Sequence, residues 1–382
     1  MIKGFIYYND QKIPFVLDNY RLDLFTDDEI LLDFIKKHNF KHHYILKGQC
    51  FRFGTIPQDI TLLIEHSMGS TCYVCCYIIK ILDKEDEYNT IGLQSPFLDD
   101  VFKYKYNYID IVRSGTNLAI EPKEIYQIPF LMNQQQYQLS FRIGHNNRLG
   151  LLEDLDKKGE VIIPIKTNDI QECFDIAQIL YRLAMFMTSH SEVPFKCITL
   201  YKNDLKVGWF YLPLVSENAV SGYDGLFHEF DVMKYVPKIL NNIALDTGNK
   251  ITQSIPLGHL GNLDSMFSPQ RFIEQITAFE YLFAKLESQK SKDKSFPLKK
   301  ELQYMFDAFP KILSNTKLSS EEISNELKTI RVNIVHGYSY YYDFKNEPDI
   351  KYKIILLDKL ILNMSLRLIG FSDSDIETYP SM

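Results

Sequence analysis

The sequence lacks three features that would place it in a special class of protein. It has no run of about 18 consecutive apolar residues, the length needed to span a bilayer. Only 6 of its 382 residues are cysteine, and their spacing is not that of a disulfide-rich scaffold. The N-terminal stretch MIKGFIYYNDQK has too short an apolar segment for a signal peptide. We therefore expect a cytoplasmic protein with reduced thiols and no membrane partner.

An excess of positive charge is also missing. The formal net charge is −7, so no global cationic field attracts nucleic acid. The first 264 residues hold 26 Lys and Arg against 33 Asp and Glu, whereas residues 265–382 hold 16 of each. The C-terminal part is therefore the less repulsive place for a polyanion.

Motifs for cofactors and metals are absent from the sequence. There is no P-loop, no Rossmann glycine pattern and no nucleophile-elbow serine, so we expect no cofactor. Cys72, Cys75 and Cys76 stand in the run TCYVCCYIIK, which is typical of a strand. Because Cys72 and Cys75 then point to opposite faces, we interpret these cysteines as structural and predict no metal site.

The N-terminal part, residues 1 to about 165, is predicted to be mostly strands. Gly4–Tyr8 and Ile13–Leu17 are short and aromatic-rich, and the turn Asn9-Asp10 joins them as a hairpin. Further strands are predicted at Cys50–Phe53, Ile60–Glu65, Thr71–Ile81, Tyr137–Ile143 and Val161–Ile165. This pattern favours a β-sandwich or a jelly-roll-like pair of sheets.

Residues 166–262 are predicted to be mixed. A helical stripe running to about Thr188 is formed by Ile170, Phe174, Ala177 and Tyr181. A hairpin follows around Asn203-Asp204, and then a helix near Phe230–Leu245. Residues 246–262 are rich in Gly, Asn, Thr and Ser, so we place a domain boundary there. Residues 1–262 would thus form a β-rich sensor or regulatory region.

The remaining residues, 263–382, are predicted to form an all-α bundle of four helices, which makes the chain α+β. Ser268-Pro269 is an N-cap followed by proline at the first helical position. Ser319 with Glu322 forms a capping box for the third helix, and Gly337 is a natural stop. The second and fourth helices are expected at about Leu298–Phe309 and Ile350–Ile369.

The end of the third predicted helix carries candidate catalytic residues, Arg331 and His336, in the run Arg331-Val-Asn-Ile-Val-His336. Histidine can donate or accept a proton near neutral pH, and the planar arginine fork matches phosphate oxygens. Asn333 lies three residues before His336 and shares its face of the helix. Residues of these types at a helix end suit phosphodiester chemistry.

The same residues carry a resemblance. The run Thr-Ile-Arg331-Val-Asn-Ile-Val-His336-Gly337 resembles the R-x4–6-H signature of the HEPN superfamily of ribonucleases. Ala278-Phe-Glu280-Tyr-Leu resembles the first-helix pattern of that superfamily, in which a glutamate follows apolar residues. The match covers about residues 265–370, and the β-rich part before it resembles the layout of ApeA-type anti-phage defence proteins. The resemblance implies a metal-independent ribonuclease that dimerises to build its active site and acts in abortive infection.

Two further sets of residues join the predicted site. The carboxylate of Glu280 could orient His336 or Arg331, or instead pair with a buried arginine such as Arg367, or lie in water at the rim of the bundle. A lysine-rich stretch at residues 285–300 could guide the RNA backbone, or be a solvated loop. The RNA-binding candidates in it are Lys290, Lys292, Lys294, Lys299 and Lys300.

We therefore expect an endoribonuclease whose partners are RNA, a second copy of the chain and a phage-derived trigger at the N-terminal region. One alternative is a non-catalytic module that binds nucleotide or RNA, or only dimerises. In that case Val332, which replaces a residue that is polar in many family members, would mark lost activity. Another alternative is a β-sandwich ligand-binding protein whose helical tail is structural.

Overall fold

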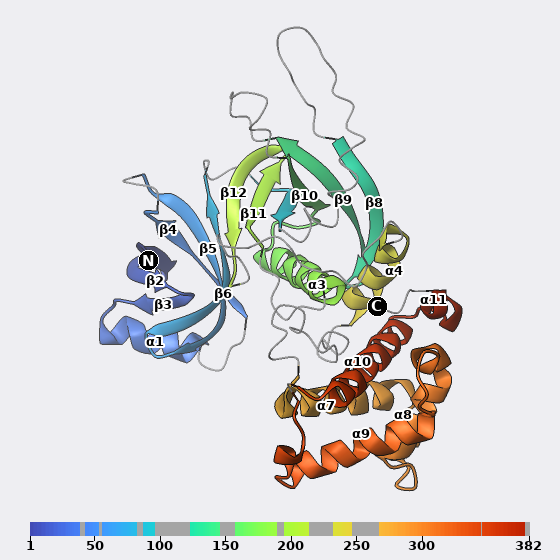
Figure 1. The fold of residues 1–382 in the computed structure, drawn as a ribbon. Coiled ribbons are helices and arrows are strands. Elements are labelled where there is room, and N and C mark those ends of the chain that lie inside the picture. Colours follow the sequence, from blue (N-terminus) through green and yellow to red (C-terminus); the bar gives the residue numbers. More distant parts are fainter. Residues whose placement is uncertain are drawn as a thin grey trace. The chain divides into compact units, whose positions relative to one another are not determined.

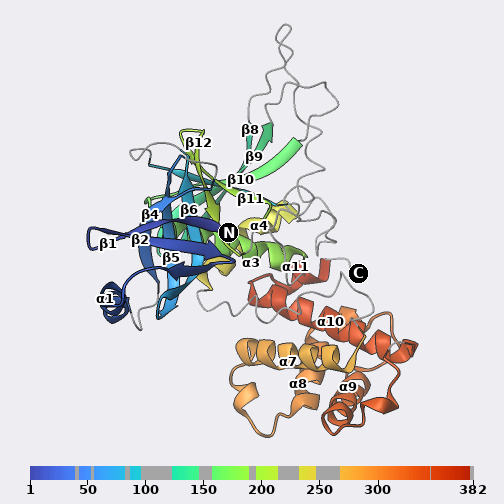
Figure 2. The same ribbon diagram turned by 90° about the vertical axis from the view of Figure 1, so that its left-hand side faces the viewer.

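The computed structural model describes residues 1–38, 43–52, 56–81, 87–95, 123–145, 157–188, 195–213, 232–246, 267–344 and 346–378. The chain divides into two compact units, Met1–Tyr181 with Val193–Gly222, and Arg182–Glu192 with Tyr223–Met382. The first is rich in strands and the second is helical (Figures 1 and 2), which confirms the predicted α+β class. Apart from Asp246, the boundary predicted at residues 246–262 lies outside the described residues.

A single antiparallel sheet forms the framework of the first unit. The described strands follow the order β3-β2-β1-β4-β5-β6-β12-β11-β7-β10-β9-β8. Their bounds are β1 Ile2–Tyr8, β2 Gln11–Asp18, β3 Arg21–Leu24, β4 Tyr44–Cys50, β5 Gln58–Met68, β6 Thr71–Lys80, β7 Thr90–Gln94, β8 Lys123–Met132, β9 Gln135–His145, β10 Lys157–Pro164, β11 Cys197–Lys202 and β12 Leu205–Tyr211. Two helices accompany the sheet in the chain, α1 Asp28–His38 and α3 Ile170–Thr188.

The first six strands close into a barrel, in place of the predicted sandwich or jelly roll. Strand β3 pairs with β2 on one side and with β6 on the other, where Leu22 lies opposite Cys72. The Thr71 hydroxyl donates a hydrogen bond of 2.6 Å to Asp23 across this seam. The barrel interior is filled by alternate, buried apolar side chains such as Ile6, Phe15 and Leu62.

Two-residue turns fix the register of the hairpins. Both residues have positive φ in Asn9-Asp10, Asn19-Tyr20, Asn133-Gln134 and Asn203-Asp204. This is the type I′ geometry, whose twist matches that of antiparallel strands and which favours Asn and Asp. The hairpins predicted at Asn9-Asp10 and Asn203-Asp204 are therefore confirmed.

A buried carboxylate ties the first turn of α3 to the sheet. Glu172 accepts hydrogen bonds of 2.7 Å from the backbone N–H groups of Lys166 and Thr167, and one of 2.8 Å from the Tyr137 hydroxyl. Burial of this carboxylate raises its pKa, but the hydrogen bonds outweigh burial and hold the pKa below its ordinary value.

The second unit contains the four predicted helices of the C-terminal part. Its helices are α4 Val232–Leu245, α7 Pro269–Leu286, α8 Leu298–Ala308, α9 Ser320–Val335, α10 Pro348–Leu368 and α11 Asp373–Thr378, with short 3-10 turns η3 Lys290–Lys292, η4 Pro310–Leu313 and η5 Ser339–Tyr341. The Ser268 hydroxyl caps α7 by accepting from the Arg271 N–H, and the capping box of Ser319 and Glu322 is present at α9. Both predicted helix starts are thus confirmed.

Helix α4 belongs to this second unit, which is therefore larger than the predicted bundle. The side-chain amide of Asn242 donates a hydrogen bond of 2.7 Å to the Ile369 carbonyl at the end of α10. The ammonium group of Lys238 lies 5.4 Å from the centre of the Phe371 ring. These contacts explain why α4, although it precedes the predicted boundary, belongs to the same unit as the C-terminal helices.

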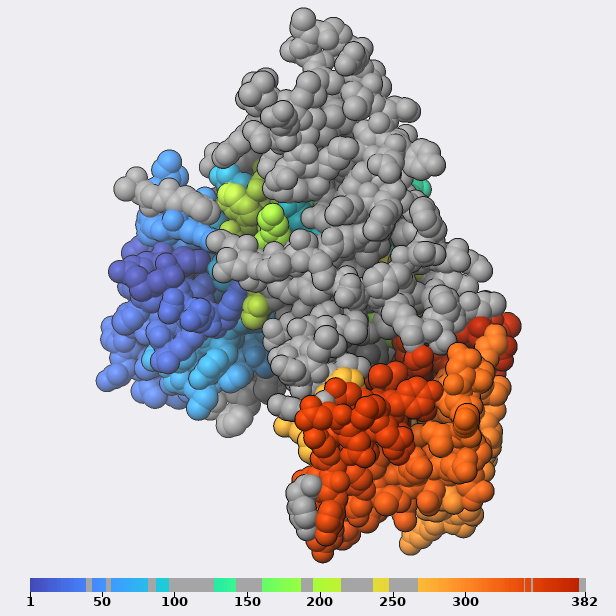
Figure 3. All heavy atoms as spheres, viewed as in Figure 1, coloured from blue at the N-terminus to red at the C-terminus, as the bar shows by residue number. Residues whose placement is uncertain are grey.

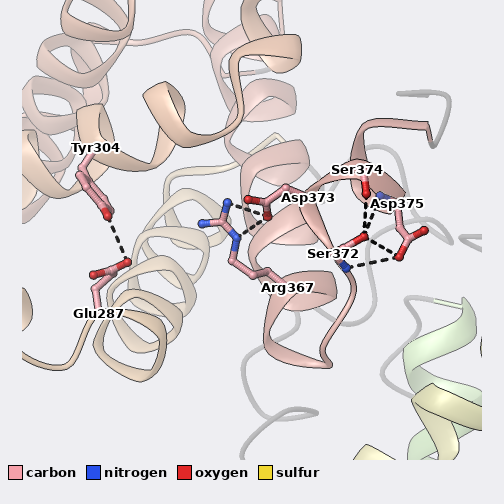
Figure 4. A network of polar contacts seen from close by, with 7 residues as sticks. All are labelled: Glu287, Tyr304, Arg367, Ser372, Asp373, Ser374 and Asp375. Carbon is pink, nitrogen blue, oxygen red and sulfur yellow. Dashed lines mark hydrogen bonds and ion pairs between the residues drawn. The ribbon is translucent and has the colours of Figure 1, made fainter.

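Polar contacts join the ends of neighbouring helices in the second unit (Figure 4). The Tyr304 hydroxyl on α8 donates to Glu287 at the end of α7 at 3.2 Å. The Arg367 guanidinium on α10 pairs with Asp373 at 2.8 Å, and Ser372 caps α11 together with Asp375. In the described part of the chain, no helix is both long and apolar enough to cross a membrane.

We expect Glu172→Gln to destabilise the first unit by about 2 kcal/mol at pH 7, because a neutral amide replaces a carboxylate that accepts several hydrogen bonds. Trp209, the single tryptophan of the chain, lies on β12, so its fluorescence during denaturation reports this unit. A carboxylate of lowered pKa contributes stability above its unfolded pKa of 4.5, and the contribution is lost as the pH falls through the folded value. The destabilisation should therefore shrink at low pH.

Glu29→Gln provides the control for this prediction, because Glu29 is an exposed carboxylate in the first turn of α1. Equal stability of the Glu172→Gln and Glu29→Gln variants would contradict the role assigned to Glu172.

Candidate functional site

The C-terminal end of α9 places the candidate catalytic residues. Gly337 has φ of +83°, the left-handed region that glycine adopts without strain. Its N–H donates to the Ile334 carbonyl at 3.0 Å, and the Tyr338 N–H donates to the Asn333 carbonyl at 2.7 Å. This Schellman arrangement ends the helix with His336 as its C-cap, as the glycine predicted.

An ion pair links Arg331 on α9 to Glu280 on α7. Nη2 of Arg331 lies 3.6 Å from Oε1 of Glu280, and the two side chains are 37% and 40% exposed. Arg367, the alternative partner considered for Glu280, pairs with Asp373 instead. Because one carboxylate cannot occupy all five N–H donors of a guanidinium, Arg331 retains donors for a phosphate.

His336 is exposed to solvent at the end of the helix. Within the described part of the chain, its ring makes no hydrogen bond or ion pair, and only its backbone N–H is engaged, with the Val332 carbonyl at 3.0 Å. Ideal helix geometry separates Arg331 and His336 by about 7.5 Å along the axis and about 140° around it. In one chain the two side chains therefore form a shallow, open site.

The side chain of Asn333 holds the segment that follows α9 against the helix. Its side-chain amide donates a hydrogen bond of 2.6 Å to the Tyr342 hydroxyl, just beyond η5. This contact fastens the segment after α9 to the helix, so one of the two amide hydrogens is already engaged. Val332 is half-buried on the same turn.

Glu301, which stands in the first turn of α8, was not among the candidate residues predicted from the sequence. Burial, and then repulsion from the nearby carboxylate of Glu280, raise the pKa of Glu301 to about 7. Acidic residues are ordinary in a first helical turn, so nothing in the sequence singled this one out. Only the packing of α8 shows that it interacts with the partner of Arg331.

Three of the five candidate RNA-binding lysines make contacts within the second unit. Lys290 pairs with Glu287 at 2.7 Å and contacts the Tyr304 hydroxyl at 3.1 Å. Lys299 pairs with Glu321 at 3.0 Å, and Lys300 donates to the Ser295 carbonyl. Lys292 and Lys294 are exposed, and within the described residues neither makes an ion pair. These two are the lysines available to a phosphate backbone.

Lys299, one of the candidate RNA-binding lysines, does not lie near His336 within one chain. Glu321, the partner of Lys299, lies in the first turn of α9, whereas His336 lies at the other end of that helix. Fifteen residues of α-helix separate them by about 22 Å. A single phosphate therefore cannot contact both Lys299 and His336.

The three cysteines of β6 are buried or half-buried, as the strand pattern predicted. Cys72 and Cys76 are buried on β6, Cys75 is half-buried, and all three are free thiols. Burial raises the pKa of the Cys72 thiol to about 11, so it is not a reactive thiolate at neutral pH. Among the described residues, no group of three or more His, Cys, Asp or Glu side chains is arranged to hold a metal ion.

We expect Glu301→Gln to stabilise the second unit increasingly as the pH rises from 5 to 8. The unfolded carboxyl has a pKa of 4.5 and the folded one about 7, so folding resists ionisation, and stability is lost as the pH rises through this window. The gain at pH 8 should be on the order of 1 kcal/mol, after discounting for partial exposure. Thermal unfolding followed by circular dichroism measures it. Asp307→Asn, an exposed carboxylate on the same helix, is the control, and a pH-independent difference would contradict the interpretation.

Comparison of the chain with models of known protein families, with curated proteins and with solved structures finds no match.

Proposed function

We propose that the protein is a metal-independent endoribonuclease in which His336 transfers protons and Arg331 stabilises charge on the phosphate. The observation that carries the proposal is the end of α9. There, a fixed helix C-cap presents the His336 ring to solvent, about one and a half turns after an arginine held by Glu280. An exposed imidazole and a guanidinium at the same helix end can together supply general acid–base catalysis and stabilisation of developing negative charge.

In the proposed reaction, the 2′-hydroxyl oxygen of RNA attacks the adjacent phosphorus and the bond to the 5′ oxygen breaks. A base takes the 2′-hydroxyl proton and an acid gives a proton to the departing 5′ oxygen. The products are a 2′,3′-cyclic phosphate and a 5′-hydroxyl. Arg331 offsets the extra negative charge of the phosphorane. These steps need an acid, a base and a positive charge, so the mechanism requires no metal ion.

A homodimer formed by the second unit completes the proposed site. One His336 ring cannot hold the positions of base and acid together, whereas two rings related by a two-fold axis can. Two open Arg331–His336 pairs that face each other would enclose a phosphate and supply catalysis by proximity. In such a dimer Lys299 lies away from the axis, because its partner Glu321 is about 22 Å along α9 from the His336 of the same chain. Lys292 and Lys294 would contact flanking RNA.

The resemblance to HEPN ribonucleases and to ApeA-type proteins supports a role in anti-phage abortive infection in the cytoplasm. In this proposal the first unit recognises a phage-derived trigger. The interior of its six-stranded barrel is filled by buried apolar side chains, so the trigger would bind to the outside of the barrel or to the rest of the sheet.

One observation favours the alternative of a non-catalytic RNA-binding or dimerisation module. Asn333 donates its amide to Tyr342, and Val332 is apolar, so the residues beside Arg331 offer little polar assistance to the chemistry. The activity of variants at His336 separates the two functions.

We expect His336→Ala to lower RNA cleavage by the full-length protein by about 100-fold or more, because loss of a general acid or base costs a factor of this size. The fold should be unchanged, since the ring is exposed. Arg331→Ala should have a comparable effect, and Lys328→Ala, an exposed cation on the same helix, should have little. The assay uses a labelled RNA with and without a chelator, followed by analysis of product ends. Full activity of His336→Ala, or products with 5′-phosphates, would refute this mechanism.

Mixing parent and His336→Ala chains tests the composite site. If cleavage needs the His336 rings of both subunits, only dimers of two parent chains will be active. An equal, fully exchanged mixture should then retain roughly a quarter of the parent activity, because a quarter of the dimers contain two parent chains. Retention of about half of the activity, under conditions where sedimentation shows exchange, would place each complete site in one chain.

A further inference from the structure

Residues 337–344, which follow α9, are rich in aromatic side chains, and four whose side chains the structure describes fall into two groups. Phe344 is buried and packs 6.4 Å from the ring of Phe272. Tyr342 contacts Phe344 edge to face and accepts the hydrogen bond from Asn333. These two rings fasten the segment to the second unit.

Tyr338 and Tyr341 form the second group and lie at the surface. Their side chains are 47% and 66% exposed, and their ring centres are 6.0 Å apart with planes tilted by 37°. The backbone beneath them is fixed, because the Tyr338 N–H donates to Asn333 and the Tyr341 N–H donates to the Tyr338 carbonyl at 3.2 Å. The segment therefore presents two exposed rings on an ordered turn.

The position of these rings relates them to the candidate site. Tyr338 is two residues after His336, so their Cα atoms are at most about 7 Å apart. Resting on the proposed ribonuclease function, we infer that Tyr338 and Tyr341 form a stacking platform for an unpaired base of single-stranded RNA whose backbone contacts Arg331 and His336. A base held there would place its own phosphate beside the catalytic groups.

The size of the patch favours a base over a protein partner. A tyrosine side chain buries about 150–250 Å² when fully covered. Two half-exposed rings thus offer about 200–250 Å², far below the 800 Å² or so that each partner contributes to a standard interface. A nucleobase is covered by one or two aromatic rings, and such stacking tolerates any base.

The charges nearby predict how this binding responds to salt. Asp343, in the same segment as Tyr338 and Tyr341, accepts hydrogen bonds from Asn346, so a carboxylate accompanies the two exposed rings. Few phosphates can be neutralised here, so the contribution of the platform to affinity should depend weakly on ionic strength. Stacking, rather than charge, would select single strands over duplexes, whose bases are already stacked.

The test measures RNA binding in the full-length His336→Ala protein, where cleavage does not interfere. The probe is a short single-stranded RNA with one 2-aminopurine, whose fluorescence is quenched on stacking; the same RNA annealed to its complement is the comparison. Changing both Tyr338 and Tyr341 to Ala should weaken single-strand binding by about 10-fold or more and abolish the quenching. Changing both to Phe should keep affinity within about 3-fold, since the rings remain. Duplex binding should not change.

The controls keep this inference separate from the proposed function. Tyr7→Ala, an exposed tyrosine on β1, should leave binding unchanged. Single-strand affinity and quenching that survive in the double Ala variant would overturn the platform. So would an equal loss for single strand and duplex, or a changed oligomeric state in sedimentation, which would make the rings a contact between two copies of the chain. If His336→Ala proves fully active while the double Ala variant loses binding, the platform stands and the assignment of His336 fails.

Discussion

The left-handed turn at Gly337 is the constraint on which the candidate site depends. A β-carbon at this position would meet no atom within 4 Å, so the requirement for glycine lies in its φ of +83° rather than in space. For another residue this conformation costs about 1–2 kcal/mol. Because the helix ends here, His336 stands at a free end of α9, and the chain turns back so that Tyr342 reaches Asn333. The positions of His336, of the exposed tyrosines and of the Asn333–Tyr342 contact therefore all depend on the backbone turn at Gly337.

A second constraint is electrostatic and lies about one and a half turns earlier on α9. Glu280 attracts Arg331 and is repelled by Glu301, so three helices meet at one carboxylate. With Glu301 protonated, the charges of these three groups sum to zero. Since the pKa of Glu301 is about 7, the sum becomes −1 at slightly alkaline pH. An anionic ligand at Arg331 then meets an additional opposing charge, although no residue has moved.

The parts of the fold that could be predicted are those stabilised by hydrogen bonds between residues close together in the sequence. The caps at Ser268, Ser319 and Gly337 and the turns Asn9-Asp10 and Asn203-Asp204 satisfy backbone groups locally, so residue type alone indicates them. The helical stripe of α3 was only half right. Ile170 and Ala177 are buried, whereas Phe174 and Tyr181 are half-buried, because the neighbours of Ile170 and Ala177 on α3, Cys173 and Ile176, share the buried face.

What could not be predicted depends on residues far apart in the chain. The closure of the barrel requires Leu22 to meet Cys72, and no periodicity within either strand encodes that pairing. The same holds for the candidate site. The spacing of Arg331 and His336 was visible in the sequence, but the pairing of Arg331 with Glu280, the proximity of Glu301 and the position of Lys299 at the other end of α9 all depend on how the helices pack.

The pairing of β3 with β6 also determines where the sheet can grow. A strand with one unpaired side is a template for a further strand from another chain. Within the described residues, β3 is paired on both sides, so the sheet, which runs from β3 to β8, has a single open edge instead of two, and that edge is β8. In the described part of the chain, an extended peptide or a neighbouring molecule can therefore add a strand to the first unit only along β8.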